Sequence, residues 1–284
     1  MATTDNADNS IPKEFIGASP LLDDREILDH ADASVVRILT GGASNHHQRG
    51  AYDGVRRTGD AYPPDRRDLF RLYNLVRSRR VTTVLEFGVG FSTSVLADAL
   101  RLNQLDYELF VSENLRRSDA WKVFSVDDSK EWIQEARARI PQNLVAHSEI
   151  LLSAVQMTTF QGRICTEYLR LPNTCPDLIY LDAPSLDLVR GEICGISTQH
   201  FDRLPMACDI LKIEHFLLPG TLIVIDGRTA NSRFLISNLQ RNWQHYDHEN
   251  DGTHFLELRE RPLGRWNAAQ IEFCLGNEWW SRVD

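Results

Sequence analysis

The residues best suited to chemistry lie in residues 84–97, with the sequence VLEFGVGFSTSVLA. An apolar run ends at Phe87, and Gly88 and Gly90 follow it just before a helical pattern that starts near Ser92. Glycine adopts backbone conformations that other residues avoid, and it lets a ligand approach the main chain. A helix N-terminus adds unbonded N–H groups and the positive end of the helix dipole. The segment therefore predicts a turn that binds a pyrophosphate or the carboxylate of a methionyl group.

Two further residues distinguish between these ligands. A dinucleotide fingerprint has a third glycine three residues after the second, and this sequence has Thr93 there. Glu86 precedes the first glycine by two residues, where a carboxylate would repel a pyrophosphate. It can instead orient the turn and accept a hydrogen bond from the cationic amino group of S-adenosylmethionine. The residues predicted to contact this cofactor here are Glu86, Phe87, Gly88, Gly90, Ser92 and Thr93. The alternative is a strand–turn–helix that binds no ligand.

A second acidic position follows the next apolar run, VFSV, as Asp127 and Asp128. In nucleotide-binding Rossmann-like folds an acidic residue at this place accepts hydrogen bonds from the ribose hydroxyls. Asp127 is the better candidate because it stands at the strand end, and the alternative for it is a helix cap. Asp128 is also predicted to contact the cofactor, or to cap the next helix.

Two more acidic residues follow apolar runs in the second half of the chain. Asp182 closes LIYLD and Asp226 closes LIVID, so both should emerge at one edge of a parallel sheet. A carboxylate there can act as a general base toward an acceptor hydroxyl. We predict Asp182, Asp226 and His200 as catalytic candidates, with Asp182 first and also in contact with the cofactor. Arg228 should pair with Asp226 or bind an anionic acceptor. For both acids a loop-stabilising role is the alternative.

The elements that must position these residues alternate along the chain. Apolar runs predict strands over residues 81–87, 123–126, 149–155, 178–181, 221–225, 243–247 and 254–258. Helices are predicted over residues 65–79, 92–102, 129–140, 201–216 and 230–242, with one or two more within 22–39. This alternation implies a parallel sheet, and the turn at residues 250–252 closes a hairpin that adds an antiparallel strand. The predicted fold class is α/β: Rossmann-like, doubly wound, with a mostly parallel seven-stranded sheet.

With these segments in view, the chain resembles the class I S-adenosylmethionine-dependent methyltransferase superfamily. The resemblance covers roughly residues 81–260 and rests on VLEFGVGFST, VFSVDDS, PDLIYLDAP, LPGTLIVIDGR and the closing hairpin. Residues 190–235 also look like methyltransferase-like proteins of bacterial surface-polysaccharide gene clusters. The resemblance implies a glycine loop at Glu86, Gly88 and Gly90 and a ribose-binding acid at Asp127.

The resemblance also organises the rest of the chain. We predict a flexible N-terminus (1–20), a helical and loop-like extension (21–80), the Rossmann-like domain (81–260) and a C-terminal tail (261–284). Residues 103–122 are long for the family and are either an insertion that shapes the site or a solvated loop. Metal-dependent O-methyltransferases have an Asp-Asn pair after the fifth strand, whereas Gly227 follows Asp226 here. A divalent metal is therefore not favoured.

Composition limits the remaining possibilities. The formal net charge of −9 disfavours broad contact with nucleic acid. No apolar run is long enough for a membrane helix, and residues 1–15 lack the pattern of a secretory signal, so a cytoplasmic location is expected. The five cysteines have no CxxC spacing, which argues against a zinc ribbon or a disulfide framework. The expected partner is a small-molecule or saccharide acceptor, and a homo-oligomer is compatible with the sequence.

Three functions remain open at this point. The first is an S-adenosylmethionine-dependent methyltransferase that methylates an oxygen of a small molecule or sugar. The second is an NAD-dependent Rossmann oxidoreductase or epimerase, which the missing third glycine and the lack of a Tyr-x-x-x-Lys pair disfavour. The third is a catalytically inactive methyltransferase fold that binds a partner.

Overall fold

The computed structural model describes residues 29–40, 65–200, 202–204, 206–248 and 252–283. Predictions for residues 1–20 and 41–64 and for most of the 250–252 turn lie outside these ranges. No helix in the described ranges is long and apolar enough to cross a membrane.

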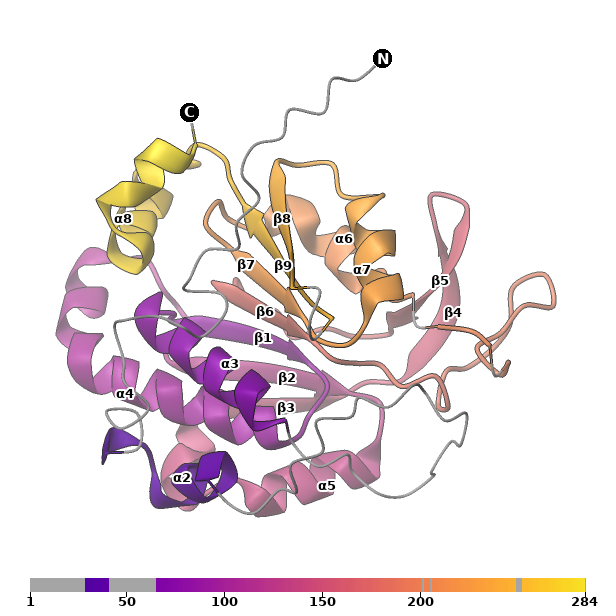
Figure 1. The fold of residues 1–284 in the computed structure, drawn as a ribbon, viewed down its shortest axis with the longest axis horizontal. Helices are drawn as coiled ribbons and strands as arrows, with labels where there is room; N and C mark the ends of the chain where they lie inside the picture. Colours follow the sequence, from indigo (N-terminus) through magenta and orange to yellow (C-terminus); the bar gives the residue numbers. More distant parts are fainter. Residues whose placement is uncertain (1–28, 41–64, 201, 205, 249–251, 284) are drawn as a thin grey trace.

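A seven-stranded sheet forms the centre of the described fold, in the order β3-β2-β1-β6-β7-β9-β8 (Figure 1). Its strands are β1 (Thr83–Phe87), β2 (Lys122–Asp127), β3 (Ser148–Leu152), β6 (Leu178–Leu181), β7 (Leu222–Ile225), β8 (Trp243–His248) and β9 (Thr253–Leu258). All neighbours pair in parallel except β9, which runs antiparallel to both β7 and β8. The predicted strands and the C-terminal hairpin are confirmed.

Helices cover both faces of this sheet. They are α2 (Ala33–Thr40), α3 (Arg66–Ser78), α4 (Phe91–Asn114), α5 (Lys130–Arg139), α6 (Asp209–Ile213), α7 (Thr229–Ile236) and α8 (Arg265–Leu275), with 3-10 turns at Gln142–His147, Glu214–Phe216 and Asn277–Arg282. Val84 and Val123 face a core built with α3 and α4, whereas Leu85 and Ile179 face a second core built with α6 and α7. Strands buried on both faces explain the unbroken apolar runs LIYL and LIVI.

Local capping chemistry sets two of the predicted helix boundaries. The carboxylate of Asp65 accepts a hydrogen bond from the N–H of Arg67 at 2.9 Å, which starts α3. Ser129 Oγ accepts from the N–H of Trp132 at 3.1 Å and starts α5, and Pro141 follows its end. Both helices were predicted from these residues.

Helix α4 is longer than predicted and replaces the expected insertion or loop over residues 103–114. Asn103 is buried in the middle of α4, and its side-chain amide donates to the carbonyls of Val76 (2.9 Å) and Val81 (2.8 Å). Val111, one turn from the end of α4, is buried in a small apolar cluster with Phe273 of α8. Contacts with residues distant in the sequence therefore stabilise this helix, and the local pattern does not show them.

Two other predicted helices are shorter. Residues 206–208 run beside β5 (Arg163–Tyr168), where Thr166 N–H donates to Met206 O and Cys208 N–H donates to Thr166 O, both at 2.9 Å. Helix α6 and one 3-10 turn cover residues 209–216 of the helix predicted over 201–216, so the prediction was right for its second half and wrong for residues 206–208. The helix predicted over 230–242 ends at Ile236.

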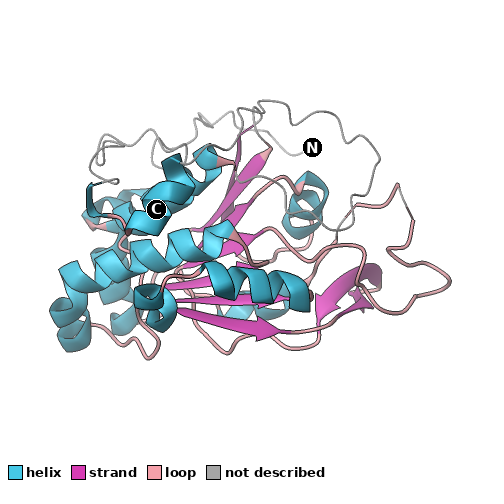
Figure 2. Cartoon of the chain, turned by 90° about the horizontal axis from the view of Figure 1, so that it is seen from below, coloured by secondary structure: helices cyan, strands magenta, loops and turns pink. Residues whose placement is uncertain are grey.

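An antiparallel hairpin that the sequence analysis missed connects β3 to β6. It consists of β4 (Val155–Phe160) and β5, joined through Gln161 and Gly162, both with positive φ. The third predicted strand, 149–155, is in fact β3 plus the first residue of β4. Consecutive parallel strands of one sheet are usually connected by a helix, whereas residues 153–177, which connect β3 to β6, contain none. Both views place the hairpin beyond one end of the main sheet (Figures 1 and 2).

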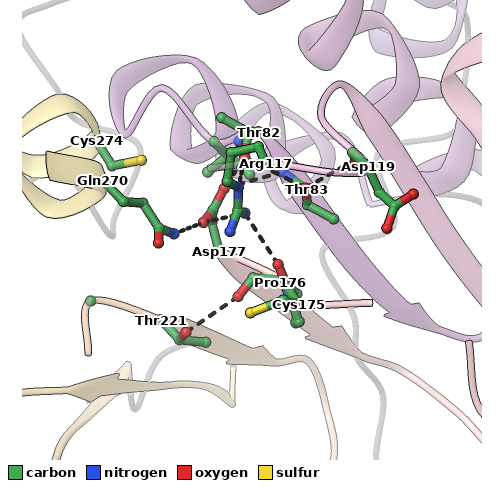
Figure 3. Close-up of polar contacts among 12 residues, drawn as sticks. Thr82, Thr83, Arg117, Asp119, Cys175, Pro176, Asp177, Thr221, Gln270 and Cys274 are labelled. Carbon is green, nitrogen blue, oxygen red and sulfur yellow. Dashed lines mark hydrogen bonds and ion pairs between the residues drawn. The ribbon is translucent and has the colours of Figure 1, made fainter. Parts of the chain in front are cut away.

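A buried polar hub closes the opposite edge of the sheet, where the parallel strands begin. Asp177 accepts hydrogen bonds from the N–H (2.7 Å) and hydroxyl (2.6 Å) of Thr82, from Arg117 (2.6 Å) and from the amide of Gln270 (Figure 3). The hub thus links the starts of β1 and β6 to the segment after α4 and to α8.

Candidate active site

The predicted glycine turn lies at the carboxyl edge of the sheet, between β1 and α4. Gly88 has a φ of 102°, and its N–H donates to Val126 O at 2.8 Å. A Cβ at Gly88 would also lie 3.1 Å from the Cβ of Ala183 in the loop after β6. Both the backbone angle and the close approach therefore require glycine here. Strand order reverses between β1 and β6, and ligands of open α/β sheets bind at such switch points.

Glu86 is fully buried beneath this turn. Its carboxylate accepts hydrogen bonds from the hydroxyls of Ser92 (2.6 Å), Thr93 (2.8 Å) and Ser125 (2.6 Å). Burial raises the pKa of Glu86 to about 7, although the three hydroxyls oppose that shift. Glu86 therefore fixes the first turn of α4 against β1 and β2, as the sequence predicted for its orienting role. Its contact with a cofactor amino group stays a prediction.

Space remains beside the second glycine. Gly90 precedes the first residue of α4, and its N–H donates to Thr93 Oγ1 at 3.1 Å. In the part of the chain that the structure describes, no atom of a non-neighbouring residue lies within 4 Å of the position that a Cβ of Gly90 would occupy. The space beside Gly90 thus lies at the N-terminus of a 24-residue helix, whose N–H groups and dipole favour an anion.

Asp127 faces the glycine turn from the end of β2. One carboxylate oxygen accepts from Val89 N–H at 3.0 Å, and the other accepts from Ser129 N–H at 2.7 Å. Burial raises its pKa, and these backbone donors oppose the shift. Each oxygen keeps a further lone pair, so Asp127 can hold the turn and still accept from a sugar hydroxyl.

Asp128 has a different environment from its neighbour. Ser129, not Asp128, caps α5. Oδ2 of Asp128 is buried and has no hydrogen-bond partner among the described residues. Burial, reinforced by the charge of Asp127, raises the pKa of Asp128 to about 7.

Backbone hydrogen bonds align Asp182 and Asp226 with the turn. Asp182 N–H donates to Phe87 O at 3.0 Å, and Asp226 N–H donates to Leu181 O at 3.3 Å. Asp182 keeps solvent-exposed surface, yet the surrounding protein desolvates its carboxylate and, with the charge of Asp226, raises its pKa to about 7. Tyr180 Oη donates to Asp226 Oδ2 at 3.4 Å. The two acids predicted at one sheet edge are brought there together.

Arg228 does not form the ion pair with Asp226 that was predicted for it, and its binding of an anionic acceptor stays a prediction. Its guanidinium donates to the backbone carbonyls of Asp182 (2.8 Å) and Pro184 (2.5 Å) and thereby holds the loop after β6. The expected pairing with Asp226 is replaced by these carbonyl contacts. Desolvation lowers the pKa of Arg228.

His200 and Phe87 are less suited to direct contact with a ligand. His200 is exposed on the long loop after β6, with Nδ1 3.8 Å from the carboxylate of Asp202. No contact with Asp182 or Asp226 is described for it. The Phe87 side chain is fully buried against the ring of Tyr168, with centroids 6.0 Å apart, so only its backbone reaches the turn.

The described residues contain no group of three or more His, Cys, Asp or Glu side chains arranged for a metal ion. Asn231, the nearest asparagine after β7, is buried and exchanges two hydrogen bonds with the backbone of Ala207, at 2.9 and 3.0 Å. It therefore does not supply the missing metal ligand.

The sequence analysis did not identify two polar residues near this end of the sheet, Tyr168 and Asp209. Tyr168 ends β5, and its N–H donates to the carboxylate of Asp209 at 2.9 Å. Gly162 within the polar stretch TTFQGRIC was a turn signal that could have indicated the hairpin carrying Tyr168.

The strand order, with the last strand inserted antiparallel between β7 and β8, defines the class I methyltransferase type of Rossmann-like fold. The fold that the resemblance implied is therefore confirmed. Neither a family model nor a curated protein matches the sequence.

Several solved structures match at low identity. An O-methyltransferase from Streptomyces achromogenes in complex with SAM is 15% identical, with 69% of this chain and 81% of that chain covered and a TM-score of 0.38. An O-methyltransferase from Bacillus cereus in complex with SAH is 15% identical, with coverages of 86% and 94% and a TM-score of 0.38. A SAH-bound methyltransferase from Podospora anserina is 13% identical, with coverages of 84% and 98% and a TM-score of 0.42. At this level of similarity, the chemistry of the chain has to be inferred from its own site.

Proposed function

We propose that the chain is an S-adenosylmethionine-dependent methyltransferase that methylates an oxygen of a small molecule or sugar. The observation that carries this proposal is the turn at Gly88 and Gly90, which has free space beside Gly90 and lies at the switch point, with Glu86 beneath it and Asp127 beside it. When bound, the cofactor supplies an electrophilic methyl group. The N-terminus of α4 would hold its carboxylate, and Asp127 its ribose.

The same residues argue against a dinucleotide. Thr93 occupies the place of the third glycine, and its buried hydroxyl donates to Glu86. A pyrophosphate at this turn would lie near the Glu86 carboxylate, whereas the amino group of a methionyl moiety is cationic and is attracted to it.

Asp182 is the proposed general base. It adjoins the turn, it keeps contact with solvent, and its pKa of about 7 suits proton abstraction near neutral pH. Arg228 would position it by fixing its backbone carbonyl. Asp226 remains a second candidate, whereas His200 would require movement of its loop. Exclusion of water and alignment of the acceptor would supply the rest of the rate enhancement.

The proposal is tested by calorimetry with S-adenosylhomocysteine and with NAD. We expect the first to bind and the second not to bind. Gly90→Arg should abolish binding, because Arg fills the space beside the turn while the extended φ of 178° suits any residue. Ser112→Arg on the exposed part of α4 is the matched control and should bind normally. Binding of NAD alone would establish the oxidoreductase alternative. A Gly90→Arg protein that keeps its biological role without cofactor binding would establish the inactive module.

A further inference from the structure

Two free cysteines that are far apart in the sequence lie in neighbouring segments of the core. Cys165 in β5 is 2% exposed, Cys208 directly before α6 is 0% exposed, and both belong to the core that contains Leu85 and Ile179. Two backbone hydrogen bonds of 2.9 Å hold their segments side by side, from Thr166 N–H to the chain at residue 206 and from Cys208 N–H to Thr166 O. These bonds join β5 to the start of α6.

The pairing of these segments places both cysteines on one face. Thr166 pairs in parallel with Ala207. Successive side chains of an extended segment point to opposite faces. Cys165 and Cys208 each adjoin one member of that pair, so both point to the face opposite the Thr166 and Ala207 side chains. Their thiols meet there, and the Cys208 S–H donates a hydrogen bond to the Cys165 sulfur.

Side chains fasten the same junction on either side of the thiols. The Asp209 carboxylate accepts from Tyr168 N–H at 2.9 Å, and Lys212 forms an ion pair with Glu167. A disulfide forms without backbone movement only where the two cysteines already face each other at short range. The backbone bonds and these two side-chain contacts keep the cysteine segments together without any bond between the sulfurs.

The two thiols differ in reactivity. The thiolate is the nucleophilic form of cysteine. The hydrogen bond from Cys208 lowers the pKa of Cys165, and the charge of Lys212 acts in the same direction. The same hydrogen bond, together with burial, raises the pKa of Cys208. Cys165 is therefore the sulfur suited to attack an oxidant first, and Cys208 stays protonated until the second step.

We propose that Cys165 and Cys208 form a reversible disulfide when the protein meets hydrogen peroxide. The Cys165 thiolate attacks one peroxide oxygen, the O–O bond breaks, and the leaving hydroxide takes up a proton to become water. Cys165 is then a sulfenic acid. The Cys208 sulfur attacks the Cys165 sulfur and loses its proton, and the sulfenic hydroxyl leaves as a second water. Peroxide is reduced and the two thiols are oxidised, and an added dithiol reverses the reaction. Peroxide is little larger than water, so a small local opening admits it.

The disulfide would restrain the junction between β5 and α6. It would lie next to Tyr168, whose ring packs on Phe87 at the end of β1. A crosslink opposes the local opening through which buried amides exchange with solvent, so the amides of Thr166 and Cys208 should exchange about 10-fold more slowly in the oxidised protein. This inference does not depend on the proposed methyl transfer.

The test is peptide mapping of the full-length protein after treatment with hydrogen peroxide and alkylation, without reduction. We expect the peptides that contain Cys165 and Cys208 to be recovered crosslinked, and to separate after dithiothreitol. A double variant, Cys175→Ser with Cys194→Ser, removes the two exposed cysteines and is the matched control that should keep the crosslink. In Cys208→Ala, Cys165 should persist as a sulfenic acid that dimedone labels. In Cys165→Ala, Cys208 should stay unlabelled.

The outcomes decide each part of the proposal. Recovery of Cys165 and Cys208 as alkylated thiols after peroxide, or a crosslink of either one to a different cysteine, overturns the pair. Equal dimedone labelling of the two alanine variants overturns the order of attack, and unchanged amide exchange overturns the restraint on the junction. Far-ultraviolet circular dichroism identifies an alanine variant that has not folded. The wild-type map and the double serine variant then decide, because they leave the core unchanged.

Discussion

Individual carboxyl groups at the strand ends have pKa values close to neutral pH, so they exchange between the charged and the neutral form there. Burial raises the pKa of Glu86, Asp128 and Asp182 to about 7 each. The Glu86 oxygens accept hydrogen bonds from three hydroxyls, whereas Asp182 keeps contact with solvent. The same shift therefore suits Glu86 for structure and Asp182 for proton transfer.

Replacement of Asp182 by Asn should remove one step from the pH profile. In the wild-type protein, Asp182 is protonated below about pH 7 and cannot accept a proton, so kcat should fall about tenfold per pH unit below that point. In Asp182→Asn, kcat should be lower by about 100-fold or more, and its pH profile should lack that step. The measurement is kcat against pH with a verified acceptor.

Glu86 and Asp128 titrate in the same range and could alter cofactor binding. The affinity for S-adenosylhomocysteine should therefore be measured at each pH, and it should be similar in the wild type and in Asp182→Asn. Unchanged turnover in the variant would exclude Asp182 as the base.

At the scale of elements, the extra length of α4 depends on contacts at its far end. Tyr107 and Phe110 pack on Phe273 of α8, with ring centroids 5.4 and 5.3 Å away. The chain then returns to β2 through Arg117, which binds Asp177 with a 2.6 Å ion pair. The segment after α4 thus connects the helices to the amino edge of the sheet (Figure 3).

Arg117→Ala should destabilise the fold strongly. Both members of the Arg117–Asp177 pair are nearly inaccessible, and removal of Arg117 leaves the Asp177 charge buried with fewer donors. Loss of one partner of a buried pair costs about 3–5 kcal/mol. Urea unfolding should show this loss. Lys122→Ala, which breaks the more exposed pair with Glu149, should cost less than about 1 kcal/mol. Equal losses of unfolding free energy from the two substitutions would contradict the stabilising role of the hub.

Elements whose signal is local could be predicted from the sequence. The strands β6 and β7 were predicted correctly because a strand buried on both faces is a short unbroken apolar run. The starts of α3 and α5 were predicted correctly because the caps Asp65 and Ser129 bind backbone groups only a few residues away. Three features escaped: the second half of α4, the β4–β5 hairpin and the loop at residues 206–208. The second half of α4 and the loop depend on partners far away in the chain, Phe273 and Thr166. The hairpin is local, and the turn signal at Gly162 that indicates it was missed.

The candidate site divides in the same way. Glu86, Gly88, Gly90, Asp127, Asp182 and Asp226 were predicted at one end of the sheet. The structure places them there because Glu86 is the penultimate residue of β1 and each of the others ends or follows a parallel strand. Their functional roles stay predictions. The position of Tyr168 could not be predicted, because its packing on Phe87 depends on the path of the chain between β3 and β6. The predicted partner of Arg228, Asp226, was wrong, because a sequence does not show which backbone carbonyls a side chain will bind.

At the scale of the whole molecule, residues 261–283 add a helical layer to the sheet and its helices. Ile271 and Trp279 are each 1% exposed, and Phe273 is 5% exposed. Ile271 also lies against Gly220, where a Cβ would meet it at 3.3 Å. Figure 1 shows this C-terminal segment in yellow beside α4.

A chain that ends at Glu260 should lose much of its stability. Burial of Ile271, Phe273 and Trp279 contributes about 1.5–3 kcal/mol each, against about 5–15 kcal/mol for a whole domain. We expect the thermal unfolding midpoint to fall by more than about 10 °C or the transition to lose its cooperativity. Trp280→Ala, at a 40% exposed side chain, is the control and should change the midpoint little. A truncated chain that unfolds like the full one would show that this layer is dispensable.

The position of β9 between β7 and β8 affects the protein during its synthesis. β7 leaves the ribosome as the strand Leu-Ile-Val-Ile, and the partner for its outer edge, residues 253–258, follows some thirty residues later. Until then an apolar strand presents unpaired backbone groups, the kind of edge that recruits other chains into aggregates. Nascent chains stalled between residues 226 and 252 should therefore depend on chaperones more than chains released after Leu258.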